Sequence, residues 1–321
     1  MISAYFVSDS DSSDGEQIAK IGSNRRMLRC MFDPLELSNE AFSHNFRVSK
    51  EIFVEILEEI TPKFQPIRSS NGLTAKEMLA ATLRFLTEGS YQRGVGNDFT
   101  VPIGQSTFSE IFEETLCALE NTLKHVITLE MTEEEQADAR RFFYEKSGIP
   151  GAVLAIDGTH IRITAPHENP VMYYNRKGFY SMNALLICDH RNIIRYVNAR
   201  FSGSNHDAFI FDSSPAIEYF ENKWRNGERV FRLLGDSAYP TKPWLVKPFA
   251  NALPGSQEAE FNTKHAQARV VIEKTIGMLK AKFRCLNGER QLRYSPTKVV
   301  RMVNVCCALH NICILNRIPE V

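Results

Sequence analysis

Three acidic residues lie where the carboxylates of a phosphoryl-transfer site could meet. Asp157 follows the apolar run 152–156, Asp236 follows the apolar run 229–234, and Glu273 lies in a segment rich in lysine and arginine. Carboxylate oxygens are the ligands that Mg²⁺ or Mn²⁺ prefers, and two such ions about 3.5–4 Å apart can activate water and stabilise a leaving oxygen. The three acids therefore predict a metal site for phosphodiester chemistry.

Each acid also has an ordinary structural explanation. Asp157 and Asp236 could be turn residues at strand ends, and Glu273 could pair with Arg269 one helical turn before it. For any one acid this explanation is favoured, because most acids at such positions are surface charges. The order strand end, strand end, helix favours the metal site when the three are taken together.

Helical geometry makes the prediction for Glu273 more specific. At about 100° per residue, Arg269, Glu273 and Lys280 lie within roughly 40° of one another, at the margin of a buried stripe. The stripe consists of Ala268, Ile272, Ile276, Leu279 and Phe283. Residues 262–301 hold ten lysines and arginines against two acids, a net charge of +8. We expect a metal-bound carboxylate flanked by phosphate-binding cations.

The elements that must position these residues change character near Gly151. Before it the apolar period is helical, with capping boxes predicted to begin helices at Thr74, Thr107 and Thr132. After it we expect a strand over 152–156, a second strand holding Ile161 and Ile163, a hairpin over 181–188 and 193–200, a strand over 229–234, and a long helix from near Thr263.

Composition indicates a soluble globular protein. The chain has 321 residues, 43% of them hydrophobic and 24% charged, and no formal net charge. We find no apolar run near the roughly 18–20 residues that span a bilayer, and no signal peptide, so we expect an intracellular protein without a membrane contact. The seven cysteines form no C-x-x-C pair and are read as reduced thiols. The Ser/Asp-rich segment 1–26 is expected to be a disordered acidic tail.

Several motifs along residues 150–312 together resemble the PIF/Harbinger family of DDE transposases and transposase-derived nucleases. Four segments carry the resemblance. They are Asp-Gly-Thr-His at 157–160, Gly-Ser-Asn-His-Asp at 203–207, Gly-Asp-Ser-Ala-Tyr at 235–239, and a block from Asn262 to Glu273 that continues to Arg284 and is followed by Leu-His-Asn at 309–311. Their order and spacing over about half of the chain make the resemblance specific.

The resemblance implies an α/β protein with a ribonuclease H-like catalytic domain over 150–321, in which a mixed sheet is flanked by helices. It implies a DDE triad of Asp157, Asp236 and Glu273 holding Mg²⁺ or Mn²⁺, with His265 and Arg269 holding phosphate or orienting the nucleophile. The expected activity is metal-dependent cleavage of DNA, with strand transfer as a further possibility.

A helix-turn-helix-like segment is implied within an all-helical region over 27–149. Its second helix carries Glu110, Glu113, Glu114 and Glu120, with no lysine or arginine before Lys124. A helix inserted into a DNA groove faces phosphates and is normally basic, so we expect a scaffold or a partner-binding surface instead.

Two other functions remain open on the sequence. One is a domesticated adaptor that does not cut DNA; family members act with a separate Myb/SANT-like protein that binds DNA and promotes nuclear import. We accordingly expect this chain in the nucleus as well as the cytoplasm. The other is a metal phosphohydrolase with a different substrate, although the +8 segment favours a polyanion.

Three smaller motifs have both a functional and a structural explanation. Cys306, His310 and Cys313 share a helical face, but their apolar surroundings favour packing over zinc binding. His206 and Asp207 could support the metal site or cap a helix. The loop 173–178 mixes aromatic and cationic residues and could contact a nucleic-acid strand or be a solvated hairpin tip.

Overall fold

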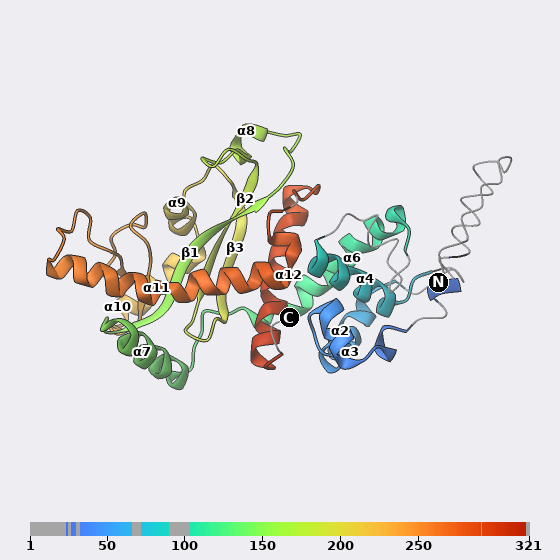
Figure 1. Ribbon diagram of the computed structural model, residues 1–321, viewed down its shortest axis with the longest axis horizontal. Helices are drawn as coiled ribbons and strands as arrows, with labels where there is room; N and C mark the ends of the chain where they lie inside the picture. The colour runs from blue at the N-terminus through green and yellow to red at the C-terminus, as the bar shows by residue number, and fades with distance from the viewer. Residues whose placement is uncertain are drawn as a thin grey trace.

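The computed structural model describes residues 24, 27–29, 33–65, 72–89, 103–289 and 291–318. A helical region and a sheet layered with helices lie side by side, and helix α12 stands between them (Figure 1). The tail predicted over 1–26 lies almost entirely outside the described residues.

The sheet has five strands in the order β3-β2-β1-β4-β5. They are β1 (Ala152–Arg162), β2 (Ser181–Cys188), β3 (Ile194–Ser202), β4 (Arg232–Leu234) and β5 (Leu245–Val246). The first three strands are antiparallel neighbours, whereas β4 and β5 run parallel to β1. This mixed topology is that of a ribonuclease H-like fold and confirms the predicted α/β class.

Strand β1 differs from the prediction. We expected a strand ending at Asp157-Gly158 and a second strand after it, but β1 continues for 11 residues through both. Strand β2 pairs with it at every position from Ala155 to Arg162, with Asp157 opposite Leu186. The continuous partner holds Gly158 in the strand, although its sequence is typical of a turn. Asp157 therefore lies in mid-strand.

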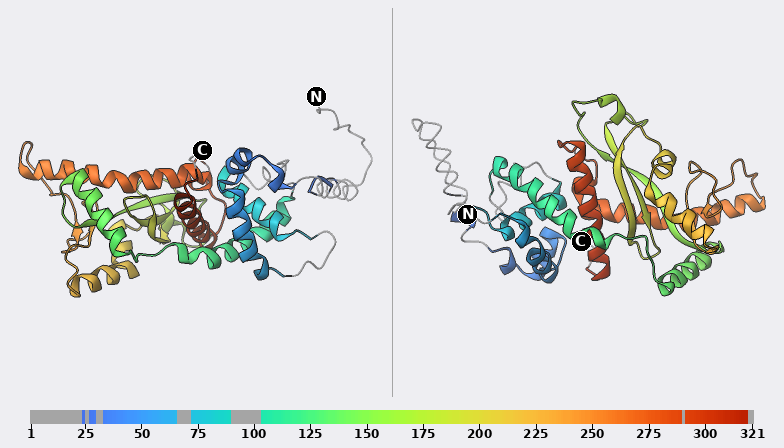
Figure 2. Two further views of the ribbon diagram at one scale, coloured as in Figure 1. Left: turned by 90° about the horizontal axis from the view of Figure 1, so that it is seen from below. Right: turned by 180° about the vertical axis from the view of Figure 1, so that it is seen from behind.

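Helices cover both faces of the sheet (Figure 2). Helix α11 (Gln257–Lys282) lies across one face and packs against α7 (Glu133–Ser147), whereas α9 (Asp207–Asp212) and α10 (Pro215–Arg225) lie on the other. Helix α11 begins earlier than the predicted Thr263, because Ser256 accepts a hydrogen bond from the amide of Ala259 and caps the helix there.

The helical region contains α2 (Asn39–Phe46), α3 (Lys50–Ile60), α4 (Ala75–Glu88) and α6 (Gln105–Leu123). The capping boxes at Thr74 and Thr132 are present as predicted. The box predicted at Thr107 is wrong, because α6 already begins at Gln105 after Gly104. Clustered phenylalanine rings from these helices, among them Phe42, Phe53, Phe85 and Phe112, form the core of the region.

Helix α12 (Pro296–Leu315) joins the two regions, packing against α6 on one side and β3 on the other. By length and composition it could cross a membrane, contrary to our reading that no such segment exists, but 61% of its apolar window is buried inside the protein. Asn311 anchors it to the sheet, because its side chain bonds both the amide and the carbonyl of Ile194.

The acids of α6 hold α12 in place. Glu113 pairs with Arg301 and also with Lys298, whose Nζ lies 3.0 Å away. Glu120 accepts a hydrogen bond of 2.7 Å from Asn304 and lies 3.5 Å from Arg301. The negative charge that argued against a DNA-reading helix therefore binds the helical region to the sheet.

Charge reversal at this contact should loosen the joint between the regions. Glu113→Lys replaces two ion pairs by repulsion, and we expect a loss of about 1–2 kcal/mol in the free energy of unfolding. Glu114→Lys, at an exposed neighbouring position, should change it by less than about 0.5 kcal/mol. Urea unfolding measures the free energy of unfolding of both variants. Equal losses in the two would show that the ion pairs between α6 and α12 do not stabilise the fold.

Candidate active site

Two of the predicted acids meet at adjacent parallel strands. Asp157 projects from the middle of β1, and Asp236 lies two residues after the end of β4. The amide of Gly158 donates to Asp157 Oδ1 at 2.9 Å, and the amide of Ala238 donates to Asp236 Oδ1 at 2.9 Å. Each carboxylate thus has one oxygen held by the backbone.

Asp157 is the electrostatic centre of the site. Its pKa is raised to about 6, chiefly by burial; Arg269 opposes this shift, and the nearby Asp207 and Asp236 carboxylates add to it. Arg269 Nη2 lies 3.0 Å from Asp157 Oδ2, with only 14% of the arginine side chain exposed. A cation therefore already partly neutralises these acids.

Glu273 lies farther from the pair than expected. Its side chain is 58% exposed, and its Oε1 is 3.9 Å from Arg269 Nη1, so Arg269 lies between Glu273 and Asp157. The predicted stripe of α11 is otherwise as expected, with Ala268, Ile272, Leu279 and Phe283 buried and Ile276 half-buried. Among the described residues, no three acidic, histidine or cysteine side chains are grouped closely enough to hold a metal ion.

Asp157 and Asp236 nevertheless have the chemistry of a divalent-cation site. Both supply hard oxygen donors, and their mutual repulsion is of the kind that a bound cation relieves. Arg269 occupies the Asp157 oxygen that a metal ion would use, with its own Nε buried and unpartnered within the described part of the chain. These residues fit a metal ion if Arg269 leaves Asp157.

His265 has a positioning contact of its own. It is buried, and its Nε2 lies 3.1 Å from the carbonyl of Val246 in β5, which can only accept a hydrogen bond. Burial lowers its pKa below the usual value. A neutral imidazole that donates to β5 links α11 to the strand beside Asp236.

Asp207 is a fourth carboxylate at the site, whose place the sequence left open. It is the first residue of α9, and Asn183 Nδ2 donates to its Oδ1 at 2.7 Å. A β-carbon at Gly158 would lie 2.2 Å from this oxygen, so the missing side chain leaves room for the carboxylate.

Tyr239 is buried close by, and no partner for its hydroxyl is found among the described residues. Burial raises its pKa, and Asp207, Asp157 and Asp236 raise it further.

The cysteine and histidine face of α12 lies in the core. Cys306 and Cys313 are buried, and His310 Nε2 lies 2.9 Å from the carbonyl of Asn192. Burial lowers the pKa of His310 to about 4, so it is neutral at physiological pH. Cys306 Sγ lies 4.0 Å from Cys285 Sγ, and Cys313 donates to the carbonyl of Arg47, so the three side chains have separate packing partners.

The close contact at Gly158 is testable with a second glycine as control. Gly158→Ala forces Asp207 away from β1, and we expect a loss of about 1–3 kcal/mol in the free energy of unfolding. Gly277→Ala lies in α11, where an added β-carbon meets nothing within 4 Å, and should stabilise by up to about 1 kcal/mol. If urea unfolding shows the Gly158 variant as stable as wild type, the Asp207 contact does not constrain β1.

Comparison with known proteins places this geometry in a family. Residues 156–311 match the family model described as DDE superfamily endonuclease. Proteins named "Putative nuclease HARBI1" from Xenopus laevis and Homo sapiens are each 32% identical over 250 residues, covering 77% of this chain and 70% of theirs. Protein ALP1-like from Arabidopsis thaliana is 28% identical over 314 residues, covering 91% of this chain and 74% of its own.

A solved structure of a piggyBac transposase synaptic complex with hairpin DNA also aligns, covering 91% of this chain and 76% of its own at 13% identity. Its TM-score of 0.39 is too low to add to the fold assignment. The two HARBI1 proteins show the family of this chain, because they are more than 30% identical to it over more than two thirds of their length. The chain belongs to the Harbinger transposase-derived nucleases of the DDE superfamily.

Proposed function

We propose that this protein is a metal-dependent DNA endonuclease that cleaves phosphodiesters with Asp157, Asp236 and Glu273. The observation that carries the proposal is the half-buried Asp157 carboxylate in mid-strand, which is beside Asp236 and paired with Arg269. A buried acid that is close to other acids is typical of a functional site rather than of a surface turn. Membership of a nuclease family supports the same reaction class.

Each residue of the site has a proposed role that follows from its position. Asp157 and Asp236 would hold Mg²⁺ or Mn²⁺, and Glu273 would complete the site from the exposed side of α11. The bound metal would supply Lewis-acid activation of water and stabilisation of the leaving oxygen. Arg269 would exchange Asp157 for a substrate phosphate, because its guanidinium can bind either group through two parallel hydrogen bonds. His265 would keep β5 and α11 in register beside Asp236.

Loss of Asp236 should abolish cleavage without abolishing binding. With Mg²⁺ or Mn²⁺ we expect purified protein to nick supercoiled plasmid, and Asp236→Ala to reduce the nicking rate at least about 100-fold. Asp212→Ala, an exposed acid at the end of α9, should behave as wild type. Gel-shift measurements without metal should show unchanged DNA binding in both variants. Unchanged nicking by Asp236→Ala would contradict the site assignment.

The pKa of Asp157 predicts a stability change with a definite sign. Because folding raises this pKa from 3.8 to about 6, ionisation of Asp157 lowers stability as the pH rises from about 4 to 6. Asp157→Asn cannot ionise, so without metal it should be more stable than wild type at pH 7.5, by on the order of 2 kcal/mol. The difference should disappear at pH 4.

Thermal unfolding in a metal chelator measures this effect at both values of pH. Added Mn²⁺ should stabilise wild type and leave Asp157→Asn unchanged. An Asp157→Asn variant that is less stable than wild type at both pH values would contradict this prediction. It would show that the carboxylate stabilises the fold.

Recognition of a particular DNA sequence would lie with another protein. Helix α6 uses Glu113 and Glu120 to bind α12, which leaves it poorly suited to a DNA groove. We propose that a Myb/SANT-like partner selects the DNA and brings this chain into the nucleus. The plasmid assay should then show no preferred nicking position for this chain alone. Failure to nick with any divalent metal would favour the non-cutting adaptor instead.

A further inference from the structure

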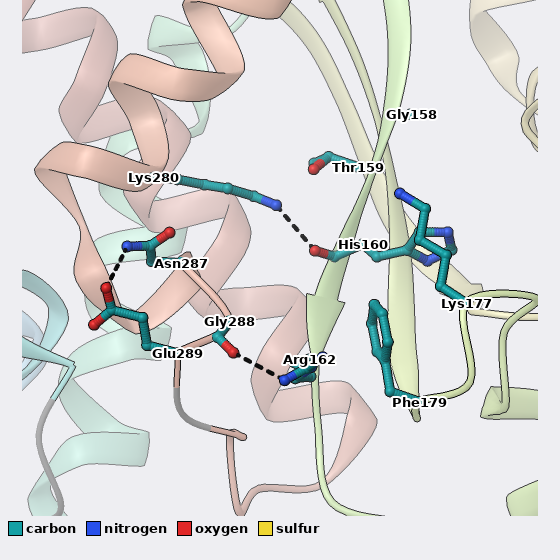
Figure 3. Close-up of a pocket in the computed structure, with 10 residues that line it drawn as sticks. All are labelled: Gly158, Thr159, His160, Arg162, Lys177, Phe179, Lys280, Asn287, Gly288 and Glu289. Carbon is teal, nitrogen blue, oxygen red and sulfur yellow. Dashed lines mark hydrogen bonds between the residues drawn. The ribbon is translucent and has the colours of Figure 1, made fainter.

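A cavity of about 430 Å³ opens along the second half of β1, beginning at Gly158 (Figure 3). Strand β4 pairs with β1 only as far as Ala155, and Leu292 contacts the far end of β1 through the Arg162 carbonyl. Between these points, α11 and residues 287–289 face the edge of β1 across the cavity. Gly158, which follows Asp157, forms one end of the lining.

Three cations line this cavity, which we call the edge pocket. Lys280 reaches from α11 and donates to the carbonyl of His160 at 3.0 Å (Figure 3). Arg162 stacks on Phe179 at 4.3 Å and bonds the carbonyl of Gly288 at 3.5 Å. Lys177 lies exposed at the rim. Two of the three cations are thus fixed in place by backbone carbonyls.

The charge of the edge pocket is not balanced by acids. None of its three cations forms an ion pair with a carboxylate in the described residues. Glu289, the acid in the lining, lies 3.5 Å from Arg284 instead. The pKa of Lys280 is lowered to about 8, chiefly by burial and in smaller part by the charge of Lys177. An anion between these cations would relieve both their repulsion and the desolvation of Lys280.

We propose that the edge pocket binds a backbone phosphate of the DNA strand that is cleaved at Asp157. Along β1 from Asp157, Gly158 lines the pocket first, followed by His160, whose carbonyl holds Lys280, and then by Arg162. An ammonium has three donors, and Lys280 uses one of them on His160, so two are left for phosphate oxygens. The inference rests on the proposed function, because it places the substrate of that same site.

The dependence of binding on salt tests the proposal without cleavage. The affinity of wild-type protein for a fluorescein-labelled DNA duplex is measured with Ca²⁺ between 50 and 200 mM salt. Lys280→Gln and Lys177→Gln should each reduce the slope of log affinity against log salt, by at most about 0.9, the value for the one phosphate that they share. Lys146→Gln, on α7 outside the pocket, should leave the slope unchanged. Lys280→Arg should keep it, since the charge is retained.

The outcomes separate this proposal from the nuclease proposal. Wild-type slopes in both glutamine variants would overturn the edge pocket as a DNA site, even if the protein cuts DNA. Reduced slopes in a protein that never nicks plasmid would support the pocket and contradict the nuclease. Lys177 is exposed, so its variant remains informative if Lys280→Gln unfolds. Inorganic phosphate is titrated in parallel, and lysine variants that weaken only its binding would make the pocket a free-anion site and overturn the proposal.

Discussion

The contact between Asp157 and Arg269 connects the central strand to the helix that crosses it. A half-buried carboxylate in mid-strand is stabilised by a compensating cation, and α11 supplies Arg269 at 3.0 Å. The same arginine turns its other nitrogen toward Glu273. One pair of side chains therefore contributes both to the position of α11 on the sheet and to the charge balance of the acids. A divalent cation and Arg269 would compete for Asp157, so metal binding and the freedom of Arg269 are coupled.

The short β4 strand determines where a substrate could lie. Because β4 pairs with only the first part of β1, the backbone beyond Ala155 faces α11 instead of another strand. The acids lie at the beginning of this uncovered edge, and the cations of the edge pocket lie along it. The proposed metal-binding Asp157 and the proposed phosphate-binding cations thus lie along the same strand, at successive positions.

The acidic helix α6 and the basic segment 262–301 meet at helix α12. Its cations Lys298 and Arg301 are engaged by Glu113 and Glu120 of α6. Part of the +8 in residues 262–301 is therefore neutralised inside the fold. Lys280 of the same segment instead lines the edge pocket and donates to the carbonyl of His160. The acidic α6 is consistent with a scaffold, as its charge pattern predicted.

Local pattern in the sequence was enough to predict the hairpin of β2 and β3, two of the capping boxes, the strand before Asp236 and the inward stripe of α11, whereas the mixed sheet was implied by the family resemblance. These features depend on short-range periodicity and on hydrogen bonds within one turn. The continuity of β1, the exposure of Glu273 and the contact of Asp207 with Gly158 could not be predicted in this way. Each depends on a residue far away in the chain. Strand β2 keeps β1 continuous, Asp157 holds the arginine that lies beside Glu273, and α9 brings Asp207 to Gly158. The sequence by itself determined which residue types could form the site, and the tertiary structure decided which of them meet, because long-range packing sets the distances between charges.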